Sequence, residues 1–366
     1  MATIKIVILC NISYDTKINH YTGKIMKLSM IKSSDYTPIM YTNNIDMQKE
    51  KVSQAINNCP TYMAIPELLR NAFQAKNVKN IYLVKRWYTA ITDDIETINS
   101  AKEKNYKCEP IGILSNEYKI TIPKLAIRND GDGIDDEKLL RITNLGQTED
   151  KEFGKHNSFG VGGKVGGLSY SPCGVQYICH HDGSYNSVLL AGIKTKNNTF
   201  FGRIKNPDQL DDNQVAMDIW DATKLVNDLN QSEYRSKTKC QIRINLLEDE
   251  NDWTEVILLG NHILEDTTKM LERPKKQDFW VANNIVDRFF SIRNKDCSIF
   301  IDNALMGEDN GTFNLLETIS ENTKYHNKSV IEIEDGIKLH FIHNPEKIDN
   351  FANDSSPIFA VIFRSE

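Results

Sequence analysis

Two glycine-rich turns in the middle of the chain constrain its fold most. The first, NDGDGI at 129–134, follows a short apolar run at 125–127, and the second, NSFGVGGKVGG, covers 157–167. Six of the chain's 19 glycines lie between 154 and 167. Glycine lets the backbone approach a ligand closely, and free N–H groups at the start of a helix bind anions. The two turns therefore predict a phosphate-binding loop beside the end of a strand.

Three common phosphate-binding loops do not fit the second turn. A P-loop requires Ser or Thr after Gly-Lys, but Val165 follows Gly163 and Lys164. A dinucleotide-binding loop and a kinase glycine loop both need a third glycine where Val165 stands. Neither HRD nor DFG occurs in the sequence. The pattern therefore indicates a different phosphate-binding architecture.

Hydrophobic periodicity predicts an α+β protein. Helices are expected at 48–58, 65–75, 93–104, 135–142, from 165, near 217–229 and at 261–271. Strands are expected at 4–9, 38–41, 80–84, 119–127, 199–204, 240–247, 253–259, 298–301, 330–333, 337–342 and 359–363. The Asp182-Gly183 pair between the apolar runs 174–179 and 187–190 predicts a hairpin.

Composition narrows the class of protein. A net charge of −6 argues against a broad basic surface for nucleic acid. No stretch approaches the length of a membrane-spanning helix, and the apolar run at 6–10 is too short for a signal peptide. The seven cysteines form no CxxC pair, so we expect free thiols and a cytoplasmic location without membrane attachment.

A predicted helix upstream of both turns has two polar residues on one face. Glu67 and Asn71 are four positions apart and follow Pro66, which suits the first turn of a helix. This helix, the NDGDGI turn and the FGVGGK turn, in this order, resemble the motifs of the GHKL ATPase superfamily. That group includes gyrase, the heat-shock chaperones, histidine kinases, MutL and MORC. The segment 236–244 is similar to the family's later strand, and the resemblance covers roughly 60–260.

The resemblance implies a fold and a domain organisation. A GHKL ATP-binding domain of the Bergerat fold, a two-layer sandwich of a mixed β-sheet and helices, is expected at 1–265. A smaller α/β region, transducer-like in position and strand content, is expected at 266–366. Residues 147–158 would form a lid that closes over ATP and excludes water.

The resemblance also implies the roles of the site residues. Asn71 would supply an oxygen to Mg²⁺, and Glu67 would orient or deprotonate the attacking water. Lys164 would balance phosphate charge, and Thr238 would lie near adenine. The ATP contacts expected are Asn71, Asn129, Asp130, Gly131, Gly133, Ile134, Phe159, Gly160, Val161, Gly162, Gly163, Lys164 and Thr238.

One residue departs from the family pattern. The family usually has Asp where Asn129 stands, and that carboxylate accepts from the adenine amino group. An Asn side chain offers one acceptor and two donor hydrogens, so adenine binding and a contact with a guanine carbonyl both stay open. Asp130 contacts the base instead if the register differs by one residue.

The function implied is slow, Mg²⁺-dependent ATP hydrolysis. Nucleotide-driven lid closure or homodimerisation would be coupled to an unknown protein or nucleic-acid partner. The alternatives are a nucleotide-sensing module with little turnover and a histidine-kinase-like phosphotransferase. Glu67 argues against the kinase, and His20 lies in an aperiodic stretch rather than a dimerisation helix. His180 and His181 suggest a metal site, although the predicted hairpin explains them equally.

Overall fold

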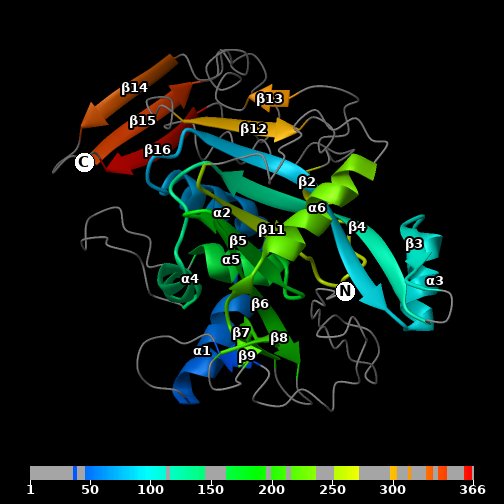
Figure 1. Ribbon diagram of the computed structural model, residues 1–366. Helices are drawn as coiled ribbons and strands as arrows, with labels where there is room; N and C mark the ends of the chain where they lie inside the picture. Colours follow the sequence, from blue (N-terminus) through cyan, green and yellow to red (C-terminus); the bar gives the residue numbers. More distant parts are fainter. Residues whose placement is uncertain are drawn as a thin grey trace.

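The chain folds as an α+β protein in which a mixed, mostly antiparallel sheet is packed against helices (Figure 1). The structure is a computed structural model. It describes residues 36–38, 46–112, 116–144, 162–194, 199–211, 216–235, 251–271, 297–302, 312–314, 327–332, 337–343 and 358–364. Within these ranges, no helix is both long and apolar enough to span a membrane.

The helices of the described residues are α1 (Asp46–Asn57), α2 (Ala64–Phe73), α3 (Ile95–Glu103), α4 (Asp136–Thr143), α5 (Gly162–Tyr170) and α6 (Thr223–Arg235). The strands are β1 (Tyr36–Pro38), β2 (Asn80–Thr92), β3 (Lys107–Pro110), β4 (Tyr118–Asn129), β5 (Val175–His181), β6 (Ser184–Lys194), β7 (Thr199–Ile204), β8 (Asn206–Leu210), β9 (Ala216–Met217), β10 (Trp220–Asp221), β11 (Trp253–Leu258), β12 (Ser298–Asp302), β13 (Thr312–Asn314), β14 (Asn327–Glu332), β15 (Ile337–His343) and β16 (Ile358–Arg364). Two short 3₁₀ segments are η3 (Thr61–Met63) and η4 (Thr267–Leu271).

Nine strands of the main sheet follow one another in the order β1-β7-β6-β5-β11-β4-β2-β12-β13. β2 and β4 form the longest antiparallel ladder, which runs from Ile81 opposite Asn129 to Thr92 opposite Tyr118. β11 lies antiparallel between β4 and β5. β12 pairs parallel with β2, and this pair makes the sheet mixed. β4 is therefore a central strand, and its end at Asn129 lies inside the fold.

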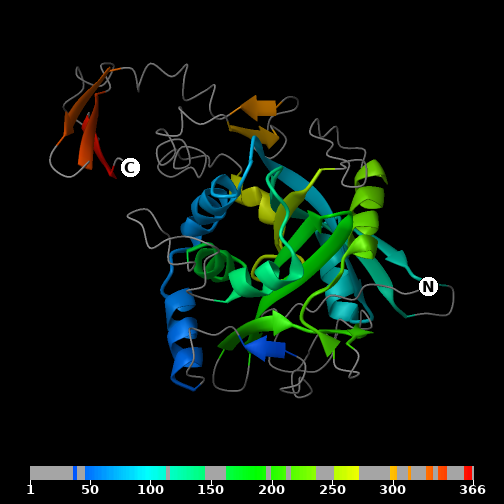
Figure 2. The same ribbon diagram turned by 60° about the vertical axis from the view of Figure 1, so that its left-hand side comes forward.

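Helices cover both faces of this sheet. Side chains of α1, α2, α4 and α5 join the apolar cluster on one face, whereas α3 and α6 pack into the cluster on the other face. Figure 2 shows α1 and α2 along one side and α6 along the opposite side. Because side chains alternate along a strand, neighbouring residues of β4 point into different clusters. Ile127 and Asn129 therefore share the face that α2 and α5 cover.

Most elements agree with the sequence prediction. The helices at 48–58, 65–75, 93–104 and 135–142 correspond to α1 to α4, and β2 extends beyond the expected end at residue 84. The hairpin is confirmed, because Asp182 and Gly183 have φ of 48° and 74° between β5 and β6. The strands expected at 4–9 and 240–247 lie outside the described residues.

The helix predicted at 261–271 is wrong. That segment consists of turns that end in η4. The buried Lys124 ammonium donates to the backbone oxygens of Leu259, Ile263 and Glu265 at 2.6, 2.8 and 2.6 Å. Gly260 also has a φ of 93°, which starts the turn. A side chain from β4 thus binds carbonyls that a helix would have used internally.

The cysteine prediction holds in part. Cys59, Cys108, Cys179 and Cys297 are free thiols. Cys173 is disulfide-bonded, so the expectation of free thiols is wrong for this residue. Pairing depends on which sulfur atoms the fold brings within bonding distance, and scattered spacing in sequence does not reveal that.

Candidate functional site

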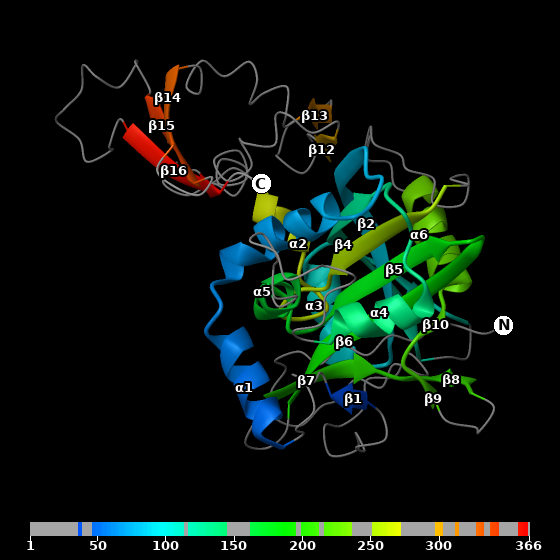
Figure 3. The ribbon, with the colours of Figure 1, turned by 90° about the vertical axis from the view of Figure 1, so that its left-hand side faces the viewer.

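The helix with Glu67 and Asn71 packs directly against the helix that starts in the second glycine turn. α2 buries Ile65, Leu68 and Leu69 against the sheet, and α5 lies beside it (Figure 3). A Cβ at position 163 would lie 2.0 Å from the Asn71 Nδ2 atom and 3.7 Å from its Oδ1. Only glycine fits at position 163, because the amide of Asn71 occupies the space of a side chain. The helix with Glu67 and Asn71 and the second glycine turn therefore meet in space.

Glu67 lies one helical turn before Asn71 on α2. The two residues are four positions apart, so they are neighbours on the helix surface. The Glu67 side chain is buried, at 8% exposure, whereas Asn71 is exposed. Burial raises the pKa of the nearby Cys59 thiol, and the Glu67 charge raises it further. A carboxylate and an amide oxygen thus lie on the face of α2 nearest to α5.

Lys164 lies in the first turn of α5 and is buried. Its ammonium donates to the backbone oxygen of Asn144, which follows α4. Desolvation lowers the pKa of Lys164 to about 7, so the charge of this side chain depends on conditions near neutrality. The Asn144 amide oxygen also accepts from Arg203 at 2.8 Å. These contacts connect the end of α4 to the start of α5.

The first glycine turn is fixed by its own acidic residues. Asp130 Oδ1 accepts from the backbone N–H groups of Lys79 and Asn80 at 2.8 and 2.7 Å, and Oδ2 accepts from Asn80 Nδ2 at 2.6 Å. Asp132 accepts from the Asn77 amide at 2.9 Å. The carboxylate of Asp130 therefore joins the turn to the start of β2.

Both glycines of this turn lie where a side chain would not fit. A Cβ at Gly131 would lie 2.7 Å from the Lys76 backbone oxygen, and one at Gly133 would lie 2.1 Å from that of His180. Ile134 follows and packs against the apolar cluster under α2. The turn therefore packs closely against the backbone of the segments beside it.

A row of polar side chains crosses the sheet beside this turn. Asn129 on β4 lies opposite Thr254 on β11, and Thr254 lies opposite Cys179 on β5. Residues directly opposite in antiparallel strands point to the same face, which here is the face of α2 and α5. The buried Thr254 hydroxyl has the Cys179 thiol as its polar neighbour and makes no hydrogen bond to an oxygen or nitrogen atom within the described part of the chain. Burial raises the pKa of the Cys179 thiol to about 12, so this neighbour is neutral.

Thr254 is a buried polar residue on this face that the sequence prediction did not name. Thr238, which the resemblance places near adenine, belongs to the segment 236–244 and lies outside the described residues. Within the described residues, β11 lies between β4 and β5 and is buried at every position. The sequence predicted this strand at 253–259, but Thr254 and Glu255 interrupt its apolar run, so no local pattern marked it as a central strand.

The remaining predicted contacts are divided between described and undescribed residues. Gly162 and Gly163, in the second glycine turn, begin α5. Phe159, Gly160, Val161 and the lid at 147–158 lie outside the described residues. Thus the described part of the site is made by α2, the turn after β4, β11 and the start of α5.

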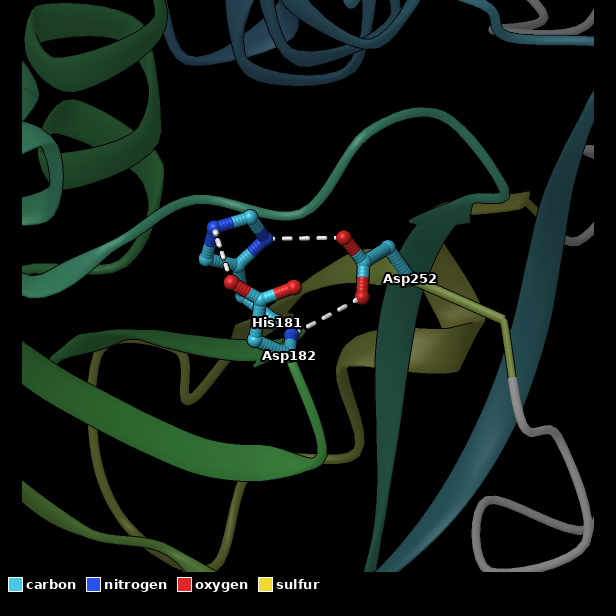
Figure 4. Close-up of side chains that lie close together, drawn as sticks. All are labelled: His181, Asp182 and Asp252. Carbon is cyan, nitrogen blue, oxygen red and sulfur yellow. Dashed lines mark hydrogen bonds and ion pairs between the residues drawn. The ribbon is translucent and has the colours of Figure 1, made fainter.

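His181, Asp182 and Asp252 form a separate cluster at the hairpin (Figure 4), and the Cβ atom of His181 would lie 3.0 Å from a Cβ at Gly133. His181 Nδ1 donates to Asp252 Oδ2 at 2.7 Å, and the Asp182 N–H donates to Asp252 Oδ1 at 3.2 Å. The ligand atoms of the three residues lie within 4.8 Å of one another. Asp182 is 90% exposed, and the hydrogen bonds join the end of β5 to the start of β11. The cluster thus ties the hairpin to β11.

Comparisons with known proteins do not assign this chain to a family. No protein-family model matches this chain, and no curated protein matches it either. The resemblance to GHKL ATPases therefore depends on the motifs and on how the fold arranges them.

Proposed function

We propose that this chain is a GHKL-type ATPase, which binds Mg²⁺ and ATP and hydrolyses ATP slowly. The observation that supports the proposal best is the contact between Asn71 and Gly163. Four motifs of one family occur in the family's order in sequence, and two of them, distant in sequence, lie against each other. The glycine at position 163 is also explained by this contact, because the Asn71 amide occupies the space that a side chain would need.

The described residues suit the roles that the resemblance implies. The Asn71 oxygen is the atom turned further from Gly163, and Mg²⁺ prefers such hard oxygen ligands. When bound, Mg²⁺ would neutralise part of the phosphate charge. Glu67 would accept a proton from a water molecule and hold its oxygen toward the terminal phosphorus. The N-terminus of α5 and Lys164 would bind phosphate oxygens.

The Bergerat fold is part of the same proposal. The sheet and the layer of α1, α2, α4 and α5 correspond to the two-layer sandwich, and α3 and α6 are additional to it on the other face. The ATP-binding domain would span 1–265 and a transducer-like region 266–366. Coupling of lid closure or homodimerisation to a protein or nucleic-acid partner follows from the resemblance alone, and a cytoplasmic location is proposed from the composition.

Glu67→Ala tests the role of the carboxylate. We expect the variant to bind Mg·ATP with unchanged affinity and to release phosphate at least about 100-fold more slowly, because a positioned general base contributes about that much. Binding is measured by calorimetry and turnover by phosphate release from the full chain. Glu96→Ala, on the exposed part of α3, is the matched control.

Three results would contradict the proposal in different ways. Equal turnover by wild type and Glu67→Ala would remove Glu67 from the mechanism. Tight nucleotide binding by wild type without any turnover would favour a nucleotide-sensing module. Transfer of the phosphate to a histidine of the chain would favour a phosphotransferase.

A further inference from the structure

Two buried polar groups of the site point to the base that it accepts. Asn129 is the last residue of β4 and is 7% exposed, and Thr254, directly opposite on β11, is 6% exposed. Both side chains lie on the face of the sheet that α2 and α5 cover. Buried polar groups almost always have partners, so groups without one indicate a ligand.

The orientation of the Asn129 amide follows from its neighbour. The Gly131 N–H donates to Asn129 Oδ1 at 3.2 Å. A backbone N–H is only a donor, so the atom facing it must be the oxygen, and the amide cannot be flipped. The Nδ2 atom therefore lies at the other terminal position of the amide, away from the Gly131 N–H. It makes no hydrogen bond with the residues that the structure describes.

In this orientation, Asn129 presents a hydrogen-bond donor where the Asp that is usual in the family would present an acceptor. An Asp at position 129 would keep the bond from Gly131 and present its second oxygen, which accepts from an exocyclic amine. Asn129 presents N–H groups at the same place, and these require an acceptor such as a carbonyl oxygen. The Thr254 hydroxyl is compatible with either kind of base, because a hydroxyl both donates and accepts hydrogen bonds.

We propose that Asn129 makes the site accept a 6-oxopurine nucleotide at least as well as an adenine nucleotide; this inference rests on the proposed function. The Asn129 N–H donates to the O6 carbonyl of the base, and the Thr254 hydroxyl accepts from its N1–H. With adenine, the 6-amino group and the Asn129 amide are both donors. One of them then stays unpaired in a buried site, which lowers affinity.

The test compares the affinities of the full chain for ATP, ITP and GTP, each with Mg²⁺, by calorimetry. ITP differs from ATP at the 6-position of the base, and GTP adds a 2-amino group. The same titrations are made with Asn129→Asp and with Asn58→Asp, a matched change at an exposed position. We expect wild type and Asn58→Asp to bind ITP as tightly as ATP or more tightly. Asn129→Asp should favour ATP over ITP by about tenfold.

The wild-type titrations alone decide the inference, even if Asn129→Asp does not fold. ATP binding that is tighter than ITP binding by about threefold or more overturns it and leaves the proposed function in place. Tight ITP with weak GTP supports it and shows that the site excludes a 2-amino group. Absence of binding by all three nucleotides overturns the proposed function and this inference together.

Discussion

At the scale of single residues, the candidate site is made by residues from distant segments that the fold brings close together. Asn71 and Gly163 come from segments more than 90 positions apart and share one space. Asn129 and Thr254 belong to different strands and meet because β4 and β11 pair in this register. A residue's role here thus depends on what the fold places opposite it.

Gly163→Ala tests the contact between α2 and α5. The added methyl would lie 2.0 Å from Asn71 Nδ2, so Asn71 must move away from its present position. We expect Mg²⁺-dependent nucleotide affinity to fall by about tenfold or more, because a displaced ligand loses the metal geometry. Calorimetry with and without Mg²⁺ measures this effect. Gly112→Ala is the control, since a Cβ there meets nothing within 4 Å; unchanged affinity in Gly163→Ala would refute the metal role of Asn71.

The lowered pKa of Lys164 predicts a pH dependence of binding. The free protein holds this side chain with a pKa of about 7, so its charged fraction decreases as the pH rises above 7. Phosphate binds the ammonium form, and binding must then take up a proton. Affinity for Mg·ATP should therefore weaken between pH 7.5 and 9, by up to about tenfold per pH unit. Titrations at several pH values measure this slope, and a Lys164→Met variant that kept the same slope would contradict the assignment.

At the scale of secondary-structure elements, β4 is held from both sides. Arg86 on β2 and Glu255 on β11 reach each other across β4 through two hydrogen bonds, at 2.8 and 2.6 Å. Both side chains are almost completely buried. Directly after the last residue of β4, Asp130 joins the end of this strand to β2. The strand that ends in Asn129 is thus fixed on both neighbours.

Glu255→Gln tests this central ion pair. The change leaves the Arg86 charge buried without its counter-ion, and we expect the free energy of unfolding to fall by about 3–5 kcal/mol. Urea unfolding of the two proteins measures the difference. The control is Glu109→Gln, which removes an exposed pair with Lys107 and should cost less than about 1 kcal/mol. Equal losses in the two variants would show that the buried pair does not stabilise the sheet.

At the scale of the whole molecule, the sequence predicted elements better than it predicted their partners. Periodicity located α2 and the hairpin, because each depends on neighbours in sequence. It did not name Thr254, because the strand opposite β4 is decided by long-range pairing. It also predicted a helix at 261–271, because nothing in that segment reveals that Lys124 binds its carbonyls.

The predicted domain boundary near residue 265 also depends on strand pairing that the sequence does not reveal. Residues after 265 were expected to form a separate region. However, β12 pairs with β2 in the main sheet, and Ile299 and Ile301 are buried in the cluster beneath α2. β14, β15 and β16 form a sheet of their own. The boundary near 265 stays a prediction, and part of the sequence beyond it belongs to the sheet that supports the site.

The most direct test of the central claim is one calorimetric titration of the full chain with ATP in the presence and absence of Mg²⁺. If α2, the turn after β4 and the start of α5 form one nucleotide site, binding will be saturable, will fit one site per chain and will weaken when Mg²⁺ is removed. If ATP and ITP both fail to bind at millimolar concentration, the motifs and their arrangement do not make a nucleotide site.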